Sequence, residues 1–305
     1  MSYKMETFEE RKVRYIEKIK NLTMMSDILA RNVLKDRECC EYILRIIMND
    51  SMLTVLDNQV QVDYKNLHGR SAVLDCVAKS GDGRLFNVEI QQEDEGAIPK
   101  RARYHLGLMD MNVLNPGEFF DKLPETYIIF VTQDDTLGYR LPIAHVDRII
   151  KENGAEFGDE AHIIYVDSSK HEDTALGRLM HDFHCKAASD MQDGVLAKRI
   201  YELKESEEGV THMCKVLEEI REEGRMEDKM ETANNLYKMG MPLEQIAQAV
   251  QVSVQMIQEW LSADCDIIVI DEPTVGVDIG AKEYIHDLIW NLAKNEQKAV
   301  VLISS

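Results

Sequence analysis

Three residues whose side chains could bind a metal ion and orient a water molecule lie on two short neighbouring segments. Asp75 lies in VLDCVAKS, and Glu89 and Gln91 lie in LFNVEIQ. Two carboxylates held close together repel each other unless a cation or a proton lies between them. Mg²⁺ prefers one or two carboxylates together with waters and phosphate oxygens. If the two segments lie side by side, the residue types favour metal-dependent hydrolysis of a phosphodiester.

The second segment has the alternation of a strand with one face in a core. Phe86, Val88 and Ile90 alternate with polar residues, so Glu89 and Gln91 share the polar face. The strand must therefore place both polar side chains on one side of a sheet.

The intervening Gly81-Asp82-Gly83 predicts a tight hairpin, with glycine at the positive-φ positions. With these three residues as the loop, Asp75 falls opposite Glu89, and opposed residues have Cβ atoms about 5 Å apart. A shift of one residue in register would weaken this pairing. The alternative interpretation is a solvent-facing hairpin with incidental acidic residues.

An ordered series of motifs around this hairpin resembles the PD-(D/E)XK nuclease family transposases, the recombination-promoting nucleases. It comprises SDILARNVLKD (26–36), Asp75 followed by N-V-E-I-Q, the KRARY helix (100–104), and GEFFDKL (117–123) before an apolar strand at 127–132. The resemblance covers roughly residues 20 to 260. Leu74 stands where the name-giving Pro would be, and Gln91 stands where Lys would be.

The resemblance implies a restriction-endonuclease-like α/β fold, with a mixed sheet core and flanking helices. It also implies a Mg²⁺-dependent DNA endonuclease. Asp75 and Glu89 would bind the metal, and Gln91 would orient the attacking water, because an amide cannot act as a base. Arg101, Arg103 and Tyr104 would position substrate phosphate; as an alternative, they are exposed helix charges and a packed aromatic ring.

Asp27 has two interpretations. Ser26 and Asp27 are both common N-cap types, so Asp27 could cap a helix. As the opening acidic residue of the family pattern, it could instead supply a further metal ligand or an outer-shell contact.

The rest of the chain divides by composition. We expect an N-terminal helix over 1–22, the nuclease-like domain over 23–200 with further strands at 125–133 and 161–169, and an acidic helical extension over 201–263. Pro99 is suited to open the KRARY helix. MPLEQIAQAVQVSVQMIQEWL (241–261) reads as a helix-turn-helix, with Pro242 near the start of one helix and Ser253 capping the other. It has no Lys or Arg, which favours packing or homodimerisation over reading a DNA groove.

The last segment differs in kind. DIIVIDEPTVGVDIGAKEYIHDLIWNLAKNEQKAVVLISS, from Asp266, resembles part of a sugar-importer ABC transporter ATPase. Asp271 and Glu272 match the Walker B acids and 275–278 match the D-loop. The GxxxxGK[ST] loop and the LSGGQ-like signature occur nowhere in the chain, so we expect a truncated β-α-β fragment over 264–305 that does not bind ATP.

Composition sets further limits. The chain has 305 residues, 45% of them hydrophobic, and a net charge of −20. Such acidity argues against simple electrostatic DNA binding, so a DNA contact must be local, as at Lys100, Arg101 and Arg103. The alternative is that these basic residues form an ordinary solvated surface. Six cysteines without C-x-x-C spacing indicate reduced thiols. His181, His184 and Cys185 share helical spacing, but without a paired motif a structural role is favoured over zinc. No apolar run is long enough to span a membrane, and we expect a cytoplasmic protein.

Three hypotheses follow. The first is the Mg²⁺-dependent endonuclease acting on DNA. The second is a catalytically weak or inactive relative that works through protein contacts, which Gln91 and the acidity favour. The third, an ATP-binding transport component, lacks its phosphate loop.

Overall fold

The computed structural model describes residues 7–64, 70–92, 94–115, 117–263, 267–271, 290 and 299–303. The chain forms two compact units that divide after Leu217. The first contains a mixed β-sheet flanked by helices, and the second contains helices and a strand pair.

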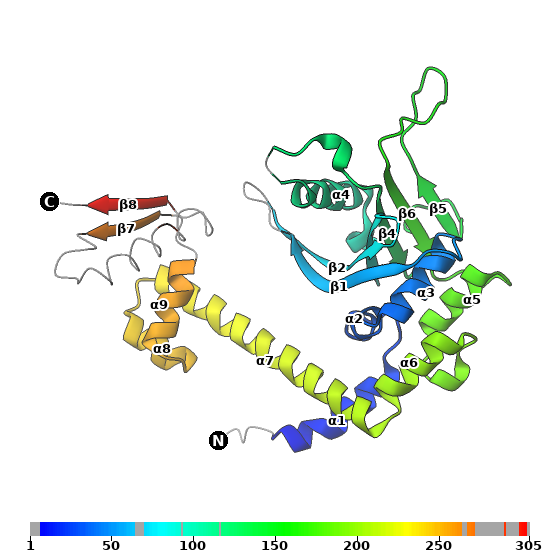
Figure 1. Cartoon of the computed structure of the whole chain (residues 1–305). Coiled ribbons are helices and arrows are strands. Elements are labelled where there is room, and N and C mark those ends of the chain that lie inside the picture. Colours follow the sequence, from blue (N-terminus) through cyan, green and yellow to red (C-terminus); the bar gives the residue numbers. More distant parts are fainter. Residues whose placement is uncertain are drawn as a thin grey trace. The chain divides into compact units, whose positions relative to one another are not determined.

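The sheet of the first unit has six strands in the order β1-β2-β3-β4-β6-β5 (Figure 1). The strands are β1 (Val55–Tyr64), β2 (Ala72–Ser80), β3 (Leu85–Gln91), β4 (Thr126–Thr132), β5 (Ile143–Val146) and β6 (Ala161–Asp167). β1, β2 and β3 are successively antiparallel, β3, β4 and β6 are parallel, and β5 returns antiparallel to β6. This mixed sheet with flanking helices is the predicted fold class.

Helices cover both faces of the sheet. α4 (Pro99–Val113) packs on one face against Leu74, Phe130 and Tyr165. On the other face, α2 (Asp27–Leu34) and α3 (Arg37–Ile47) lie against the sheet (Figure 1). α5 (Ala175–His184) and α6 (Gly194–Lys204) pack on these two helices, and α1 (Phe8–Asn21) adds Tyr15 and Ile19 to the same core cluster. Short 3₁₀ turns η1 (Asp94–Ala97), η2 (Phe120–Lys122) and η3 (Ala188–Asp190) complete the unit.

The covering helices explain one difference from the sequence prediction. β3 is buried on both faces, not one, and Asn87 and Glu89 are fully buried. α4 covers the polar face of the strand, so this face becomes part of the interior. The predicted hairpin loop is present, since the Ser80 N–H donates to the carbonyl of Arg84 across residues 81–83. Of the three loop residues, however, only Gly83 has a positive φ, at 98°.

The predicted helix starts at Pro99 and Ser253 are confirmed, and the segment 26–36 is divided between two helices. Pro99 occupies the first turn of α4. The Ser253 hydroxyl accepts a hydrogen bond from the Met256 N–H at the start of α9 (Val254–Ala263). The segment 26–36, read as one helix, ends at Leu34, and α3 begins immediately after the N-cap Asp36, whose side chain accepts from the Cys39 N–H.

A buried lysine joins α6 to the end of α1. Lys204, at the end of α6, is 4% exposed, and its Nζ donates to the main-chain carbonyls of Lys20 and Leu22 at the end of α1. It also donates to the carbonyl of Lys186. Three acceptors match the three donors of an ammonium group, so α1 is fixed to the core by residues far along the chain.

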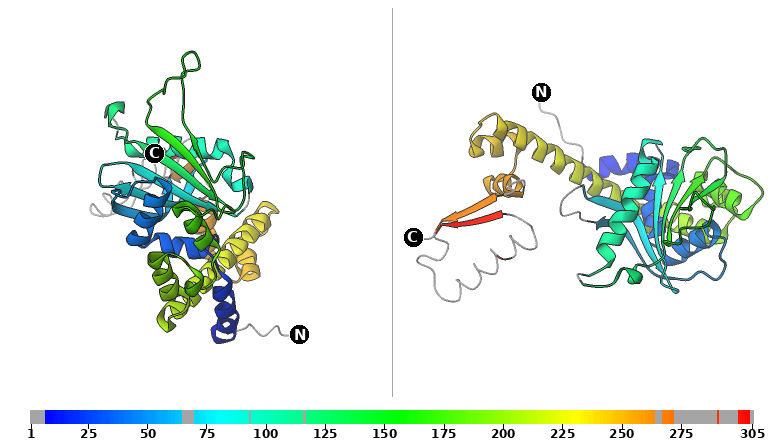
Figure 2. Two further views of the ribbon diagram at one scale, coloured as in Figure 1. Left: turned by 90° about the vertical axis from the view of Figure 1, so that its right-hand side faces the viewer. Right: turned by 90° about the horizontal axis from the view of Figure 1, so that it is seen from above.

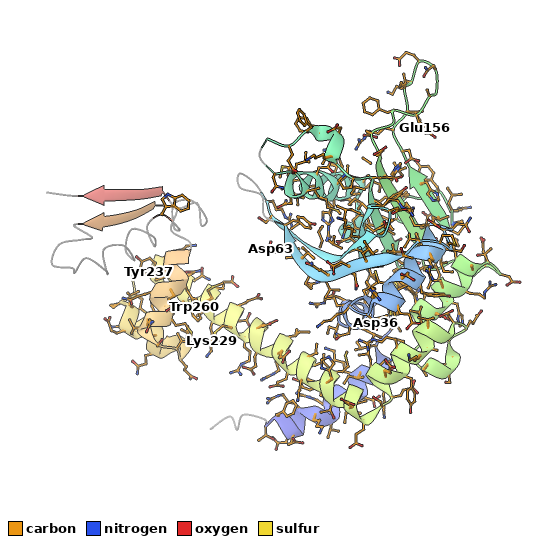
Figure 3. All side chains as sticks on the ribbon, viewed as in Figure 1. Asp36, Asp63, Glu156, Lys229, Tyr237 and Trp260 are labelled. Carbon is orange, nitrogen blue, oxygen red and sulfur yellow. The ribbon has the colours of Figure 1, made fainter. Side chains whose placement is uncertain are left out.

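The segment between β5 and β6 projects beyond the sheet in Figure 1 and in the left view of Figure 2. Glu156 lies on this arm (Figure 3). The arm is closed by one isolated bridge between Ile149 and Glu156 and by an ion pair between Arg148 and Asp159.

The second unit contains most of the acidic extension. The division falls within α7 (Glu207–Lys238), a helix of 32 residues. The end of α7 packs with α8 (Leu243–Val250) and α9 around Ala233, Ile246 and Ile257. The two short helices match the predicted helix-turn-helix, and their pairing with a second chain stays a prediction. β7 (Ile267–Asp271) and β8 (Ala299–Ile303) form a parallel pair.

Candidate active site

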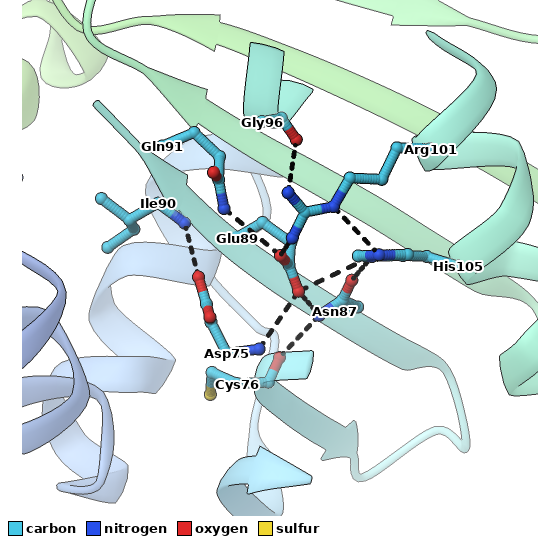
Figure 4. A network of polar contacts seen from close by, with 9 residues as sticks. All are labelled: Asp75, Cys76, Asn87, Glu89, Ile90, Gln91, Gly96, Arg101 and His105. Atoms are coloured by element: carbon cyan, nitrogen blue, oxygen red, sulfur yellow. Dashed lines mark hydrogen bonds and ion pairs between the residues drawn. The ribbon is translucent and has the colours of Figure 1, made fainter. Parts of the chain in front are cut away.

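β2 and β3 separate where the two acidic residues meet. Their ladder pairs Lys79 with Leu85 through to Cys76 with Val88, and its continuation places Asp75 beside Glu89, as the hairpin prediction required. Beyond Cys76, carboxylate oxygens replace main-chain carbonyls as the hydrogen-bond acceptors between the two strands (Figure 4). The Asp75 N–H donates to Glu89 Oε1 at 3.1 Å, and the Ile90 N–H donates to Asp75 Oδ2 at 3.3 Å. Each carboxylate therefore holds the main chain of the other strand.

Glu89 is surrounded by hydrogen-bond donors. Asn87 Nδ2 donates to Oε1 at 2.9 Å, and Arg101 Nη2 of α4 forms an ion pair with Oε2 at 3.2 Å. Gln91 Nε2 lies 3.5 Å from Oε2. The carboxylate is therefore held in place by several donors. The sequence prediction had Arg101 contact a substrate phosphate, whereas in the structure its guanidinium contacts Glu89.

Arg101 is itself positioned by two further groups. Its Nη1 donates to the carbonyl of Gly96 at 2.9 Å, and its Nε donates to His105 Nε2 at 3.2 Å. A guanidinium is always a donor, so Nε2 of His105 is the acceptor and Nδ1 carries the proton. Nδ1 lies 3.4 Å from Asn87 Oδ1. Burial, and then the charge of Arg101, lower the pKa of His105 to about 4, which keeps the ring neutral.

The two carboxyl groups are difficult to ionise together. Burial, followed by the charge of Asp27, raises the pKa of Asp75 to about 6. Burial, followed by the charge of Asp75, raises the pKa of Glu89 to about 7. Arg101 opposes both shifts without cancelling them. Glu89 is therefore partly protonated at neutral pH, and a bound cation would favour the charged form of both carboxylates.

An open cleft of about 360 Å³ gives access to Asp75, while Glu89 lies buried behind it. Its lining includes Asp75, Gln91, Gln61 and Asp27. The lining supplies carboxylate and amide oxygens, which suit a hard cation such as Mg²⁺. The donor set therefore fits the implied metal.

Asp27 lies in the wall of this cleft and does not cap α2. Ser26 is the N-cap, without a side-chain capping bond, and Asp27 is the first helical residue, with its carboxylate on Arg31. Within the described part of the chain, Asp27, Asp75 and Glu89 do not bring three ligand atoms within 4.8 Å of one another. Asp27 therefore acts on Asp75 through its charge.

His181, Asp182 and Cys185 do form such a close group. Asp182 is fully buried, and its carboxylate accepts from the main-chain N–H groups of Gln192 and Asp193 at 2.8 and 2.9 Å. Cys185 lies 3.4 Å from the carbonyl of Asp190. These contacts stabilise the turn before α6, which is a structural role.

The predicted phosphate-contacting residues line a second cleft of about 610 Å³, between the start of β2 and the first turns of α4. Arg103 is exposed, and the Tyr104 hydroxyl donates to the carbonyl of Arg70. Arg101 and His105 line the same cleft. It therefore reaches the residues that hold Glu89.

Sequence reasoning did not identify Asn87, His105 or Gly96 as parts of the site. Signals for two of them were present. Asn87 shares the face of Glu89 by the period of a strand, and His105 lies one helical turn after Arg101. No local pattern singled out Gly96, because its role depends on the path of η1 beside β3.

A mixed sheet with two carboxylates paired at the open end of a hairpin defines a nuclease-like α/β protein. The chain belongs to the PD-(D/E)XK nuclease family transposases, whose model matches residues 48–235, more than half of its length. The sequence-based recognition of this family is confirmed. No solved structure matches the chain.

Short matches to transport ATPases accompany the family match. The putative ribose/galactose/methyl galactoside import ATP-binding protein 1 of Rhizobium meliloti is 53% identical over 49 residues, 16% of this chain and 10% of that protein. Protein 3 of the same description from Burkholderia ambifaria is 54% identical over 50 residues, and the arabinose import ATP-binding protein AraG of Mannheimia succiniciproducens is 44% identical over 50, with the same shares. The chain spans a tenth of the length of these relatives. Of the Walker B pair, Asp271 ends β7, and Glu272 lies outside the described residues.

Proposed function

We propose that this protein is a Mg²⁺-dependent endonuclease that hydrolyses phosphodiester bonds in DNA. The observation that carries the proposal is the meeting of Asp75 and Glu89 beside an open cleft, in a chain of a nuclease family. Their raised pKa values show that the charged forms are disfavoured without a partner, and a bound cation would supply one.

Asp75 and Glu89 would hold the metal, and Asp27 would add negative charge through an outer contact. When bound, Mg²⁺ lowers the pKa of a coordinated water and neutralises charge on the scissile phosphate. Gln91 lines the same cleft as Asp75, and its amide would orient the attacking water. The 3′-oxygen would leave.

Arg101 supplies the positive charge that Gln91 cannot carry. Its guanidinium is 3.2 Å from Glu89, and it also lines the second cleft, between the start of β2 and α4. It would hold Glu89 before metal binding and then share its donors with the substrate phosphate. Arg103 and Tyr104 would position the flanking phosphates.

One observation favours the second hypothesis, an inactive relative that acts through protein contacts. Glu89 already accepts hydrogen bonds from the Asp75 N–H and from the Asn87 and Arg101 side chains. Such a carboxylate can serve a purely structural role. Activity therefore decides between the two hypotheses.

The test is nicking of supercoiled plasmid in Mg²⁺ and in EDTA. Asp75→Asn and Glu89→Gln should each reduce Mg²⁺-dependent nicking at least 100-fold, because each loses a negatively charged ligand. Glu38→Gln, an exposed acid on α3, is the matched control and should cleave like the wild type. Full nicking by both site variants would refute the site, and no nicking by the wild type in Mg²⁺ would favour the inactive relative.

A further inference from the structure

The cleft between β2 and α4 combines positive charge with exposed apolar surface. Its described lining includes four basic residues, Arg70, Lys100, Arg101 and Arg103, and no acidic one. In a chain of net charge −20, this concentration is local. It meets the electrostatic requirement for binding a nucleic-acid backbone, which the whole molecule does not.

Apolar and aromatic groups in the same cleft are unusually open to solvent. Val73 is 48% exposed, Ile98 is 47% exposed, and Tyr104 is 37% exposed. The hydroxyl of Tyr104 donates to the carbonyl of Arg70, which fixes the ring against the start of β2. Apolar surface between basic groups suits the flat face of a base and the phosphates on either side of it.

The cleft is also of the right size and in the right place. Its volume of about 610 Å³ lies within the range of sites that enclose a small organic ligand. It reaches the active site through Arg101, whose guanidinium contacts Glu89 and also lines the cleft. A group bound there would be one side chain away from the carboxylate pair.

We propose that this cleft binds an unpaired nucleotide next to the scissile phosphate, so that the preferred substrate is single-stranded or locally unpaired DNA. The base would lie on Val73, Ile98 and Tyr104, and the adjoining phosphates on Lys100 and Arg103. In intact duplex DNA the base faces are covered by stacking and cannot reach this surface. The inference rests on the proposed function for its position beside a cleavage site, but binding can be measured without cleavage.

The experiment uses the full chain carrying Asp75→Asn, in EDTA, with a fluorescent single-stranded oligonucleotide and the duplex of the same sequence. Anisotropy should show at least tenfold tighter binding of the single strand. Lys100→Ala with Arg103→Ala should weaken that binding about tenfold. The slope of log K against log salt should become shallower by about 1.4, or 0.7 for each of two lost phosphate contacts.

A second variant tests the base-binding surface separately. Ile98 is the N-cap of α4, so Ile98→Ser places a favoured capping residue there and should keep the helix intact. It should weaken single-strand binding at least fivefold and leave the salt slope unchanged. The matched control is Arg37→Ala with Lys198→Ala, two exposed residues on α3 and α6 across the sheet, which should bind like the parent.

Equal affinity for duplex and single strand, or equal effects of the two charge-removing pairs, would overturn the inference even if the wild type cleaves plasmid. The expected binding pattern in a wild type that does not cleave would refute the nuclease proposal and leave the nucleotide site standing.

Discussion

Asp75 and Glu89 are acidic residues in surroundings that disfavour their charge. Glu89 is fully buried and experiences the charge of Asp75, and Asp75 experiences the charge of Asp27. Such groups bind protons more tightly in the folded chain than in the unfolded chain, where their pKa values are ordinary. Folding of the metal-free protein must therefore depend on pH at these two residues.

The sign follows from the raised pKa values of about 6 and about 7. Between about pH 4 and pH 7 the folded state holds more protons than the unfolded state, so the free energy of unfolding in EDTA should fall as pH rises. Asp75→Asn keeps an oxygen for the Ile90 N–H and removes the charge. It should raise the free energy of unfolding at pH 7.5 by on the order of 1 to 3 kcal/mol.

Thermal unfolding followed by circular dichroism checks this prediction. At pH 4 the variant and the wild type should unfold within about a degree of each other, because Asp75 is then protonated in the folded wild type. Mg²⁺ at pH 7.5 should stabilise the wild type and leave Asp75→Asn unaffected. A lower melting temperature for the variant at pH 7.5 in EDTA would show that the charged form of Asp75 is favourable.

At the scale of elements, the close approach of η1 to β3 sets the position of Gln91. A Cβ added to Gly96 would lie 2.0 Å from Gln91 Oε1 and 3.5 Å from Arg101 Nη1. The first contact is with the end of a flexible side chain, so the fold can accept it if the amide moves. The amide would then leave the place from which we propose that it orients water.

Gly96→Ala should therefore reduce the turnover of Mg²⁺-dependent cleavage about tenfold and change the melting temperature by no more than about 2 °C. Gly107→Ala is the matched control, since Gly107 lies within α4 and an added Cβ meets nothing within 4 Å. That change should leave turnover unchanged and stabilise the helix slightly. Wild-type turnover in Gly96→Ala would remove Gln91 from the proposed mechanism.

The hairpin is the part of the site that sequence could predict. Alternating residues, three loop residues and the spacing from Asp75 to Glu89 are local features, and the observed register agrees with them. Burial of the polar face of β3 was not predictable from the same segment. It depends on α4 and on Arg101 and His105, which only the three-dimensional path of the chain brings to Glu89. The basic cleft likewise joins Arg70 to Lys100 across an interval that no periodicity links.

At the scale of the whole molecule, the family match and the transporter-like matches describe different kinds of protein. The family model ends at residue 235. The import ATP-binding proteins match this chain over 49 or 50 residues. Among the described residues, no helix combines the length and apolar character needed to cross a bilayer. The described part of the ATPase-like segment contains one parallel strand pair, β7 with β8.

Deletion of residues 264–305 should accordingly leave Mg²⁺-dependent nicking within about twofold of the full chain and increase solubility. Neither form should bind ATP, because the sequence has no phosphate loop to hold a nucleotide near Asp271. Equilibrium dialysis with labelled ATP and Mg²⁺ measures this directly. Saturable binding at millimolar concentration or below that Asp271→Ala abolishes would support the transport hypothesis.

The three hydrogen bonds from Lys204 to main-chain carbonyls bear on when α1 can be stabilised during synthesis. A ribosome releases α1 first, but the carbonyls of Lys20 and Leu22 receive their ammonium partner only after residue 204 has emerged. Contacts over such sequence separations form late, because closing the long intervening loop costs entropy. The growing chain therefore lacks these bonds to α1 while the hairpin with Asp75 and Glu89 is already available to pair. A ribosome stalled before Lys204 would hold a chain whose candidate site residues are made and whose first helix still lacks the ammonium partner of its last carbonyls.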